Sequence, residues 1–578
     1  MLKTFHRLLN KRCPQPRSFA VQPVYILSVL IYTMSDSKSG RCPSKEAQCT
    51  PKSLKKSMSE WQFAPSSVFE NNLPIDSEED SYIRPNVKGA IFSRVQPTPL
   101  EKDVRLVAFS KDVLINILNM DPSITETDEF VRWVAGSNVL SSSTPLAHRY
   151  GGHQFGAWAA QLGDGRAMSL GEYVSHDGRR WDIQLKGSGL TPYSRGGDGR
   201  AVIRSSVREF LCSEAMHALS VPTTRAAALV VSNDPVIRDQ FYDGRPEIER
   251  AAVVMRIAPS FLRFGSLEIL TSTSELSELR KLLNYILELR TDITEYGDQK
   301  YLALLEKVID ESIKLVIAWS MVGFTHGVLN TDNMSMFGVT IDYGPFGFME
   351  KFDRNFVPNS SDSGGRYSFV EQLGIVHWNL AKLVMAVRPL LSEPEQKQAE
   401  QMLRNAVATG EAQFIAGFHE KLGFKPNSTA NTQLVHLLVE MMQDTSSDFT
   451  MTFRQLAFVK LDEMLDPKVL DKYWALKVFS RHPRFKEFVH TYKQTMIIEG
   501  LSDEKRRSNM LAKNPQYVLR NWMAQDAIKL AEQDDFSGVQ FLLEILNNPF
   551  TINETAEKKG YSGPTPPWAN CIRVSCSS

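Results

Sequence analysis

The stretch that decides the fold is His326-Gly-Val-Leu-Asn-Thr-Asp-Asn333, followed nine residues later by Asp342-Tyr-Gly344. Asn333 and Asp342 carry hard oxygen atoms, which are the ligands that Mg²⁺ prefers. The segment from Met334 to Gly344 is typical of a short β-hairpin, and such a hairpin would bring the two ligands together. We therefore expect a magnesium site here, with Mn²⁺ as a substitute.

The spacing of these residues matches two elements of protein kinases. A kinase catalytic loop reads H-R-D-x-x-x-x-N, and its downstream metal-binding element reads D-F-G. Asn333 and Asp342 fall at the metal-binding positions, but the position of the catalytic Asp holds Val328. Because an aliphatic side chain cannot accept a proton, the chain keeps residues that hold Mg-ATP and lacks the residue that makes an ordinary kinase.

Composition excludes several other classes of protein. The 578 residues include 66 basic and 66 acidic side chains, so no global field points to nucleic acid or to an anionic membrane. Six cysteines, without C-x-x-C spacing, indicate neither a disulfide scaffold nor structural zinc. His148 and His153 lie in a Gly-rich stretch, where a structural role is favoured over metal binding.

The N-terminus differs from the rest of the chain. Five basic residues precede the first acid, Asp36, which is typical of a mitochondrial transit peptide. The apolar run 24–32 leaves a secretory signal open, and Met34 leaves a cytosolic start open, but nine residues cannot span a bilayer. Residues 35–57 are rich in Ser, Lys and Pro, so we expect residues 1–57 to be a transit peptide and a disordered linker.

A glycine turn and a strand follow in the folded part. Gly163-Asp-Gly165 precedes Arg166, and its glycines would allow the backbone to approach a ligand, although the same tripeptide is also an ordinary hairpin turn. The stretch 181–186 alternates apolar and polar residues, as a strand does. It ends in Lys186, about twenty residues after the turn, as the strand bearing the ATP-binding lysine of a kinase does.

A helix predicted to begin near Ser205 carries Glu209 in its first turn. Ser206-x-x-Glu209 matches a capping box, in which the glutamate satisfies its own helix N-terminus. Alternatively, Glu209 pairs with Lys186 and holds its ammonium on the phosphates. The order of the features along the chain favours the ion pair.

Arginines surround these elements. A guanidinium group can bind two phosphate oxygens at once, which suits a polyphosphate ligand. Ion pairs at the protein surface would explain some of these arginines equally well. The candidates are Arg195, Arg200, Arg204, Arg208, Arg256 and Arg263. Downstream, apolar periodicity predicts a long buried helix over 301–324 and a mainly helical region over 369–550.

Five longer blocks identify a family. The chain resembles selenoprotein O, the pseudokinase family whose members are protein adenylyltransferases, over about residues 60 to 578. The blocks are His148-Arg-Tyr-Gly-Gly-His-Gln-Phe-Gly156, Leu185-Lys-Gly-Ser-Gly-Leu-Thr-Pro-Tyr-Ser-Arg195, Gly197-Asp-Gly-Arg200, His326–Asn333 and Asn514-Pro-Gln-Tyr-Val-Leu-Arg-Asn521.

The resemblance implies an α+β, bilobed, protein-kinase-like fold with an extended helical C-terminal half. The N-lobe would span residues 58–265, the helical C-lobe 266–550 and a flexible tail 551–578. ATP, the co-substrate, would bind in an orientation flipped relative to kinases. AMP would then pass to Ser, Thr or Tyr hydroxyls of proteins, with release of pyrophosphate. An atypical kinase remains the alternative, because Asp332 could serve as the base in a conventional ATP pose, and a non-catalytic ATP-sensing scaffold is disfavoured.

The resemblance also implies roles for single residues. Asp332 matches the proton acceptor, although from spacing alone it could equally be a structural loop residue. Glu209 matches the helix glutamate paired with Lys186, and Asn333 and Asp342 match the magnesium ligands. The implied nucleotide contacts are Gly163, Gly165, Arg166, Lys186, Asp198, Gly199, Arg256, Arg263 and Asp342.

The C-terminus differs from that of the animal members by one atom, a sulfur in place of a selenium. Animal members carry selenocysteine followed by two serines, and Cys576 stands in that place here. A thiol is less acidic and less reactive than a selenol, so a redox role does not carry over directly. An exposed tail cysteine that could close a small loop with Cys571 is the simpler interpretation. The sequence names neither the protein substrates nor the oligomeric state.

Overall fold

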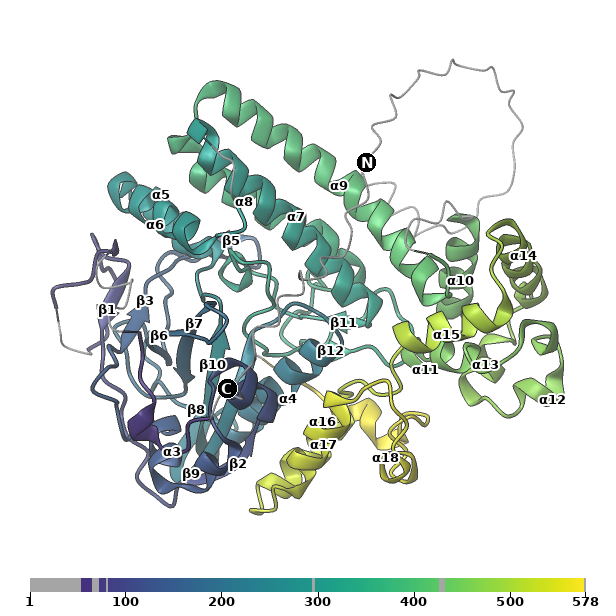
Figure 1. Cartoon of the computed structure of the whole chain (residues 1–578), viewed down its shortest axis with the longest axis horizontal. Helices are drawn as coiled ribbons and strands as arrows, with labels where there is room; N and C mark the ends of the chain where they lie inside the picture. Colours follow the sequence, from purple (N-terminus) through teal and green to yellow (C-terminus); the bar gives the residue numbers. More distant parts are fainter. Residues whose placement is uncertain (1–53, 65–71, 79–81, 294–296, 426–431, 576–578) are drawn as a thin grey trace, which may run out of the picture.

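An antiparallel sheet occupies the first half of the chain (Figure 1). The computed structural model describes residues 54–64, 72–78, 82–293, 297–425 and 432–575. The predicted transit peptide, most of the predicted linker and Cys576 lie outside these residues. The strands follow the order β1 (Phe92–Arg94), β3 (Leu146–His148), β6 (Ala167–Val174), β7 (Arg180–Lys186), β10 (Glu247–Ala258), β9 (Arg225–Arg238) and β2 (Arg105–Phe109), and β8 (Ala201–Val202) pairs with β10.

Strand β7 shows how the sequence builds this sheet. Trp181, Ile183 and Leu185 join one hydrophobic core, as the alternation predicts. Asp182 and Gln184 on the opposite face are buried as well, so the strand is covered on both sides. Lys186 ends the strand opposite Val254 of β10.

Helices make up most of the remainder. The predicted mixed α/β class and the helical C-terminal half are both confirmed. The helices are α3 (Asp128–Val134), α4 (Ile203–Ala218), α5 (Phe264–Ser272), α6 (Leu276–Leu289), α7 (Lys300–Met321), α8 (Gln372–Val387), α9 (Glu393–Lys421), α10 (Thr432–Thr445), α11 (Phe449–Leu456), α12 (Pro467–Leu470), α13 (Trp474–Phe479), α14 (Phe485–Ile498), α15 (Asp503–Lys513), α16 (Asn521–Ala531), α17 (Ser537–Asn547) and α18 (Glu554–Lys558). No helix within the described ranges has the length and apolar content to cross a membrane.

Helix α4 is held from two sides. It packs on strands β9 and β10, and its other side contacts α17 near the C-terminus. The Nε2 of Gln540 on α17 donates to the Val107 carbonyl on β2 at 3.1 Å, and Arg208 on α4 donates to the Asn521 amide oxygen at 3.1 Å. The C-terminal helices therefore fix the position of the helix that carries Glu209.

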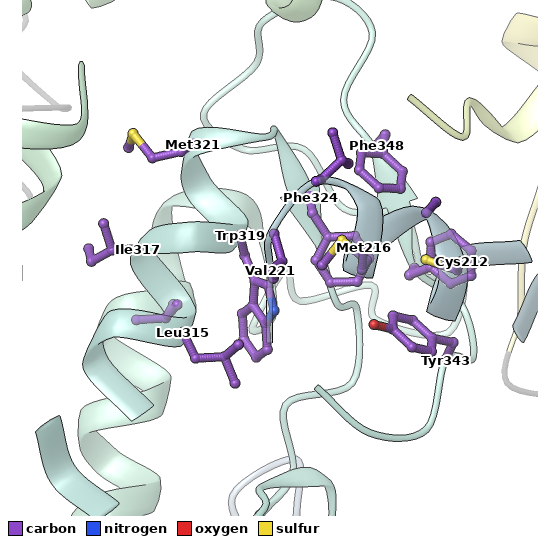
Figure 2. Packing of buried hydrophobic residues seen from close by; sticks show 14 of the residues in the cluster. Cys212, Met216, Val221, Leu315, Ile317, Trp319, Met321, Phe324, Tyr343 and Phe348 are labelled. Carbon is purple, nitrogen blue, oxygen red and sulfur yellow. The ribbon is translucent and has the colours of Figure 1, made fainter. Parts of the chain in front are cut away.

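A hydrophobic core joins α4 to the loop of Asp342. Figure 2 shows Cys212 and Met216 of α4 beside Phe324 and Tyr343, with all four side chains buried. Phe324 belongs to β11 (Phe324–Thr325), which pairs with β12 (Gly347–Phe348). The loop that begins at His326 is thus anchored at its start by packed aromatic rings.

The structure corrects one local prediction and excludes one alternative. Residues 334–344 do not form a hairpin, because their backbone groups bond to other segments: Ser335 bridges to Arg263, and Thr340 bridges to Thr223. Glu209 does not belong to a capping box, because α4 begins two residues earlier than predicted, at Ile203. Val202 pairs in the sheet and the chain turns directly into the helix, so Ser206 lies inside it.

The segment 551–575 also differs from the predicted flexible tail. It contains α18 and the short helix η9 (Pro567–Cys571). Tyr561 packs against Trp522 of α16, with ring centroids 5.5 Å apart, and the Ser360 amide donates to the Val574 carbonyl at 2.8 Å. Burial of these rings ties the segment to the body. Cys571 is exposed and carries a free thiol.

Candidate active site

A cleft of about 660 Å³ lies where the sheet meets the loop after His326. It collects residues from segments far apart in the sequence. Of the predicted site residues, Gly163, Gly165, Arg166, Lys186, Asp198, Gly199, Glu209, Arg256, Asp332, Asn333 and Asp342 all line it. Arg263 does not line the cleft. It is 1% exposed and lies behind the wall, in contact with Asp342.

Lys186 and Glu209 form the ion pair that the order of features favoured. The Lys186 ammonium lies 2.6 Å from Oε2 of Glu209, and Arg256 reaches Oε1 at 2.9 Å. Burial lowers the pKa of Lys186, and the charges of Glu209 and Asp342 oppose this effect. One buried carboxylate therefore orients two cations at the cleft wall, where they would face bound phosphates.

Asp342 is the most strongly held carboxylate of the site. Its Oδ1 lies 2.5 Å from Arg256 and 3.4 Å from Lys186, and its Oδ2 lies 2.6 Å from Arg263. Burial would raise its pKa, but these three cations outweigh burial and hold the pKa well below its ordinary value. Its backbone adopts φ +57°, a left-handed conformation that Asp tolerates better than most residues. The side chain is thereby fixed as a permanent anion.

Asp332 is in a very different environment, although it also lines the cleft. It is 7% exposed, its Oδ2 accepts a 3.3 Å bond from Nε2 of Gln154, and its Oδ1 has no partner among the described residues. Burial raises the pKa of Asp332 to about 6, against the opposing charge of Arg263 and the bond from Gln154. A carboxylate with a free oxygen and a raised pKa is suited to accept a proton.

The Gly-rich turns shape the two ends of the cleft. Gly163 adopts φ +86°, and a Cβ there would lie 2.4 Å from the Tyr193 ring, so only glycine fits. Gly152 packs against Asp332, and a Cβ there would lie 2.8 Å from Oδ1. Asp198 lines the rim and forms a bidentate pair with Arg238 at 2.7 and 2.8 Å.

The residues present fit a divalent cation. Nδ2 of Asn333 donates to the Val328 carbonyl at 2.9 Å, which leaves Oδ1 as its ligand atom. The Asp342 carboxylate is ionised and carries further lone pairs beyond those used by the arginines. Two hard oxygen donors that line the same cleft match the ligand chemistry of Mg²⁺.

Sequence reasoning missed Gln154 and Gln184. The first bonds to Asp332 across 178 positions, and the second accepts from the Arg256 guanidinium across 72. Gln154 lies within the quoted block 148–156, where glycines on both sides signal close backbone packing. That signal marks the segment but does not name its partner.

Comparison with known proteins identifies the family. A family model described as protein adenylyltransferase SelO matches residues 86–547. The chain belongs to the SelO family. It is 42% identical over 522 residues to the protein nucleotidyltransferase YdiU of Azoarcus sp. (strain BH72), covering 88% of this chain and 99% of that protein. The YdiU protein of Rhodopirellula baltica is 41% identical over 541 residues, covering 88% and 98%.

The SelO match confirms the resemblance drawn from the five blocks. It spans every predicted site residue, from Gly163 to Asp342. Helix α18 and the segment 567–575 lie beyond it, and Val574 and Ser575 of that segment also line the cleft.

Proposed function

We infer that this chain is a protein adenylyltransferase, which transfers AMP from ATP to hydroxyl groups of proteins and releases pyrophosphate. Family membership and the names of its relatives support the activity. At the site, the inference is carried by two residues taken together, Val328 and Asp332. The usual kinase base is replaced by an aliphatic residue, while a carboxylate with a raised pKa lines the same cleft four residues later.

The cations of the cleft support binding of the triphosphate. We propose that Lys186, Arg166 and Arg256 bind its oxygens, within a bilobed, kinase-like arrangement with an N-lobe at 58–265 and a C-lobe at 266–550. The nucleotide would lie flipped relative to kinases, so that the α-phosphate faces Asp332. Gly163, Gly165 and Gly199 would admit the nucleotide close to the backbone.

The proposed reaction follows from this placement. Asp332 accepts the proton of a Ser, Thr or Tyr hydroxyl while the oxygen of that hydroxyl attacks the α-phosphorus. The bond from that phosphorus to the bridging oxygen breaks, and pyrophosphate leaves. Lys186 and Arg256 stabilise the negative charge that develops on the leaving group. Asn333 and Asp342 would hold Mg²⁺, which when bound neutralises phosphate charge.

Labelled ATP tests this function directly. The full chain is incubated with a protein acceptor and with ATP labelled on either the α- or the γ-phosphate, and the products are weighed by mass spectrometry. We expect AMP on the acceptor, with the α-label retained. A transferred γ-phosphate would establish the alternative, an atypical kinase with Asp332 as base, and binding without any transfer would establish an ATP-sensing scaffold.

The cellular location is a separate proposal. We propose import into mitochondria, supported by the basic, acid-free start of the chain. A fusion of residues 1–57 to a fluorescent protein would be imported and cleaved. Secretion of the fusion, or a cytosolic product that begins at Met34, would contradict it.

A further inference from the structure

Two exposed aromatic rings flank the cleft beside Asp332. They belong to a small hairpin formed by β4 (His153–Gln154) and β5 (Ala157–Trp158). Phe155 is 47% exposed and Trp158 is 38% exposed, although large aromatic residues are usually buried. Gln154 and Phe155 line the cleft itself. The hairpin is therefore both a wall of the active site and part of the outer surface.

The hairpin is fixed to the catalytic loop by its backbone. The His153 amide donates to Oγ1 of Thr331 at 2.7 Å, and the Phe155 amide donates to the Tyr367 hydroxyl at 2.9 Å. The Tyr367 hydroxyl in turn donates to Oδ1 of Asn330 at 2.5 Å. Asn330 and Thr331 directly precede Asp332 in the sequence. The exposed rings consequently hold a set position relative to the carboxylate.

Two cations extend this surface: Arg366, which precedes α8, and Lys382 on α8. The Arg366 guanidinium lies 5.0 Å from the Trp378 ring centroid, and the Lys382 ammonium lies 4.8 Å from it. The Trp378 ring meets the His153 ring at 5.4 Å, which in turn meets Trp158 at 5.2 Å. Within the described residues, Arg366 and Lys382 contact aromatic rings and form no ion pair. The charge of Lys382 acts on the buried Glu268, whose Oε1 lies 2.6 Å from Nδ1 of His153, but neither Arg366 nor Lys382 forms a direct ion pair among the described residues.

We propose that these residues, Phe155, Trp158, Arg366, Trp378 and Lys382, form the docking surface for the acceptor polypeptide, and that they favour acceptors with an acidic side chain near the reactive hydroxyl. The proposal rests on the proposed function, because it names the substrate class of that site. A hydroxyl that reaches Asp332 must bring its flanking residues across the hairpin, since Gln154 and Phe155 border the carboxylate.

Charge complementarity decides the chemistry of the partner. Aromatic rings supply contact area for any polypeptide, whereas the two cations discriminate by charge. Guanidinium and ammonium groups bind carboxylates, so an acidic acceptor residue would pair with cations that form no direct ion pair among the described residues. An acidic acceptor segment therefore gains contacts that a neutral one lacks.

The test uses two peptides that differ in one residue. Both carry a single acceptor hydroxyl and a flanking position occupied by Asp in one and by Asn in the other. For the full chain we expect kcat/KM to favour the Asp peptide by roughly 5-fold, the size of a good, partly exposed ion pair. The difference should lie in KM and shrink at high salt, because screening weakens such pairs.

Charge reversal supplies the decisive variant. Lys382→Glu should abolish or invert the preference, while kcat and ATP affinity stay within about 2-fold of wild type. Arg366→Gln should reduce the preference in the same direction and guards against a folding defect in the first variant. Lys468→Glu is the matched control, because Lys468 is exposed on α12, which lies at the far end of the molecule from α8 and the hairpin (Figure 1), and it should leave the preference unchanged.

The outcomes separate this inference from the function on which it rests. AMP transfer with equal kcat/KM for the two peptides would overturn the docking surface and leave the adenylyltransferase standing. So would a preference that survives Lys382→Glu. AMP found only on a second copy of this chain would overturn an external acidic acceptor. Transfer of the γ-phosphate, or of nothing, would overturn the proposed function itself.

Discussion

Replacement of Asp332 by Asn is expected to stabilise the protein while it removes catalysis. The carboxylate is buried, and one of its oxygens has no partner among the described residues. Burial raises its pKa from 3.8 to about 6. A rise of about two units corresponds to about 3 kcal/mol of free energy that the folded state loses when Asp332 is ionised.

The size of the effect depends on pH. Below the unfolded pKa the group is protonated in both states and costs nothing; the penalty grows as pH rises toward 6 and is complete above it. Asn is neutral throughout, so the variant should be more stable than wild type by about 1–3 kcal/mol at pH 7.5. The lower end allows for an amide NH₂ without a partner. At pH 4 the gap should fall below about 1 kcal/mol.

Urea unfolding followed by tryptophan fluorescence measures this gap, with wild type and Asp332→Asn compared at both pH values and without metal or nucleotide. AMP transfer should fall roughly 10²- to 10⁴-fold with ATP affinity little changed, as for removal of a general base. A variant no more stable than wild type at pH 7.5 would refute the argument from burial. Retained transfer would refute the assignment of Asp332 as base.

Three further predictions concern Asp342, the ion pair of Lys186 with Glu209, and Val328 at the position of the kinase base. Asp342→Ala should abolish transfer and Mg-dependent nucleotide binding, and activity near wild type in a binding and transfer assay would remove it from the metal site. Lys186→Ala should lose activity because the triphosphate is misplaced. Glu209→Gln should lower kcat/KM less than Lys186→Ala does, because glutamine still offers one acceptor to the two cations. A larger loss in Glu209→Gln than in Lys186→Ala would contradict the ion pair. Val328→Asp should transfer no γ-phosphate from labelled ATP above the wild-type level, since the proposed pose presents the α-phosphate, and a gain would show that the conventional pose is accessible.

Features that depend on residues close together in the sequence could be predicted from local sequence patterns. Lys186 ends the predicted alternating strand, and Asn333 and Asp342 line the same cleft as Lys186, although the hairpin expected to join them does not form. The ion pair of Lys186 with Glu209 needed only the order strand, then helix. For Asp332, spacing left a structural role equally open, and the resemblance to the family supplied its function.

Contacts between distant segments could not be predicted in this way. Residues 334–344 look like a hairpin because the sequence does not show that Thr223 and Arg263 compete for their backbone groups. Residues 551–575 look like a free tail because their polar composition hides Tyr561, whose burial depends on α16. Gln154 was passed over because its partner lies 178 positions away.

The double support of α4 bears on how tightly ATP can bind. Many kinases switch by moving the helix that carries the corresponding glutamate, and a ligand then binds only the fraction of molecules in which that helix is in place. Here α17 lies against the outer side of α4, so Glu209 and Lys186 are paired before any nucleotide arrives. The competent state is the resting state, and affinity is not divided by a small population. An inhibitor that gains selectivity by displacing this helix would first have to separate α4 from α17.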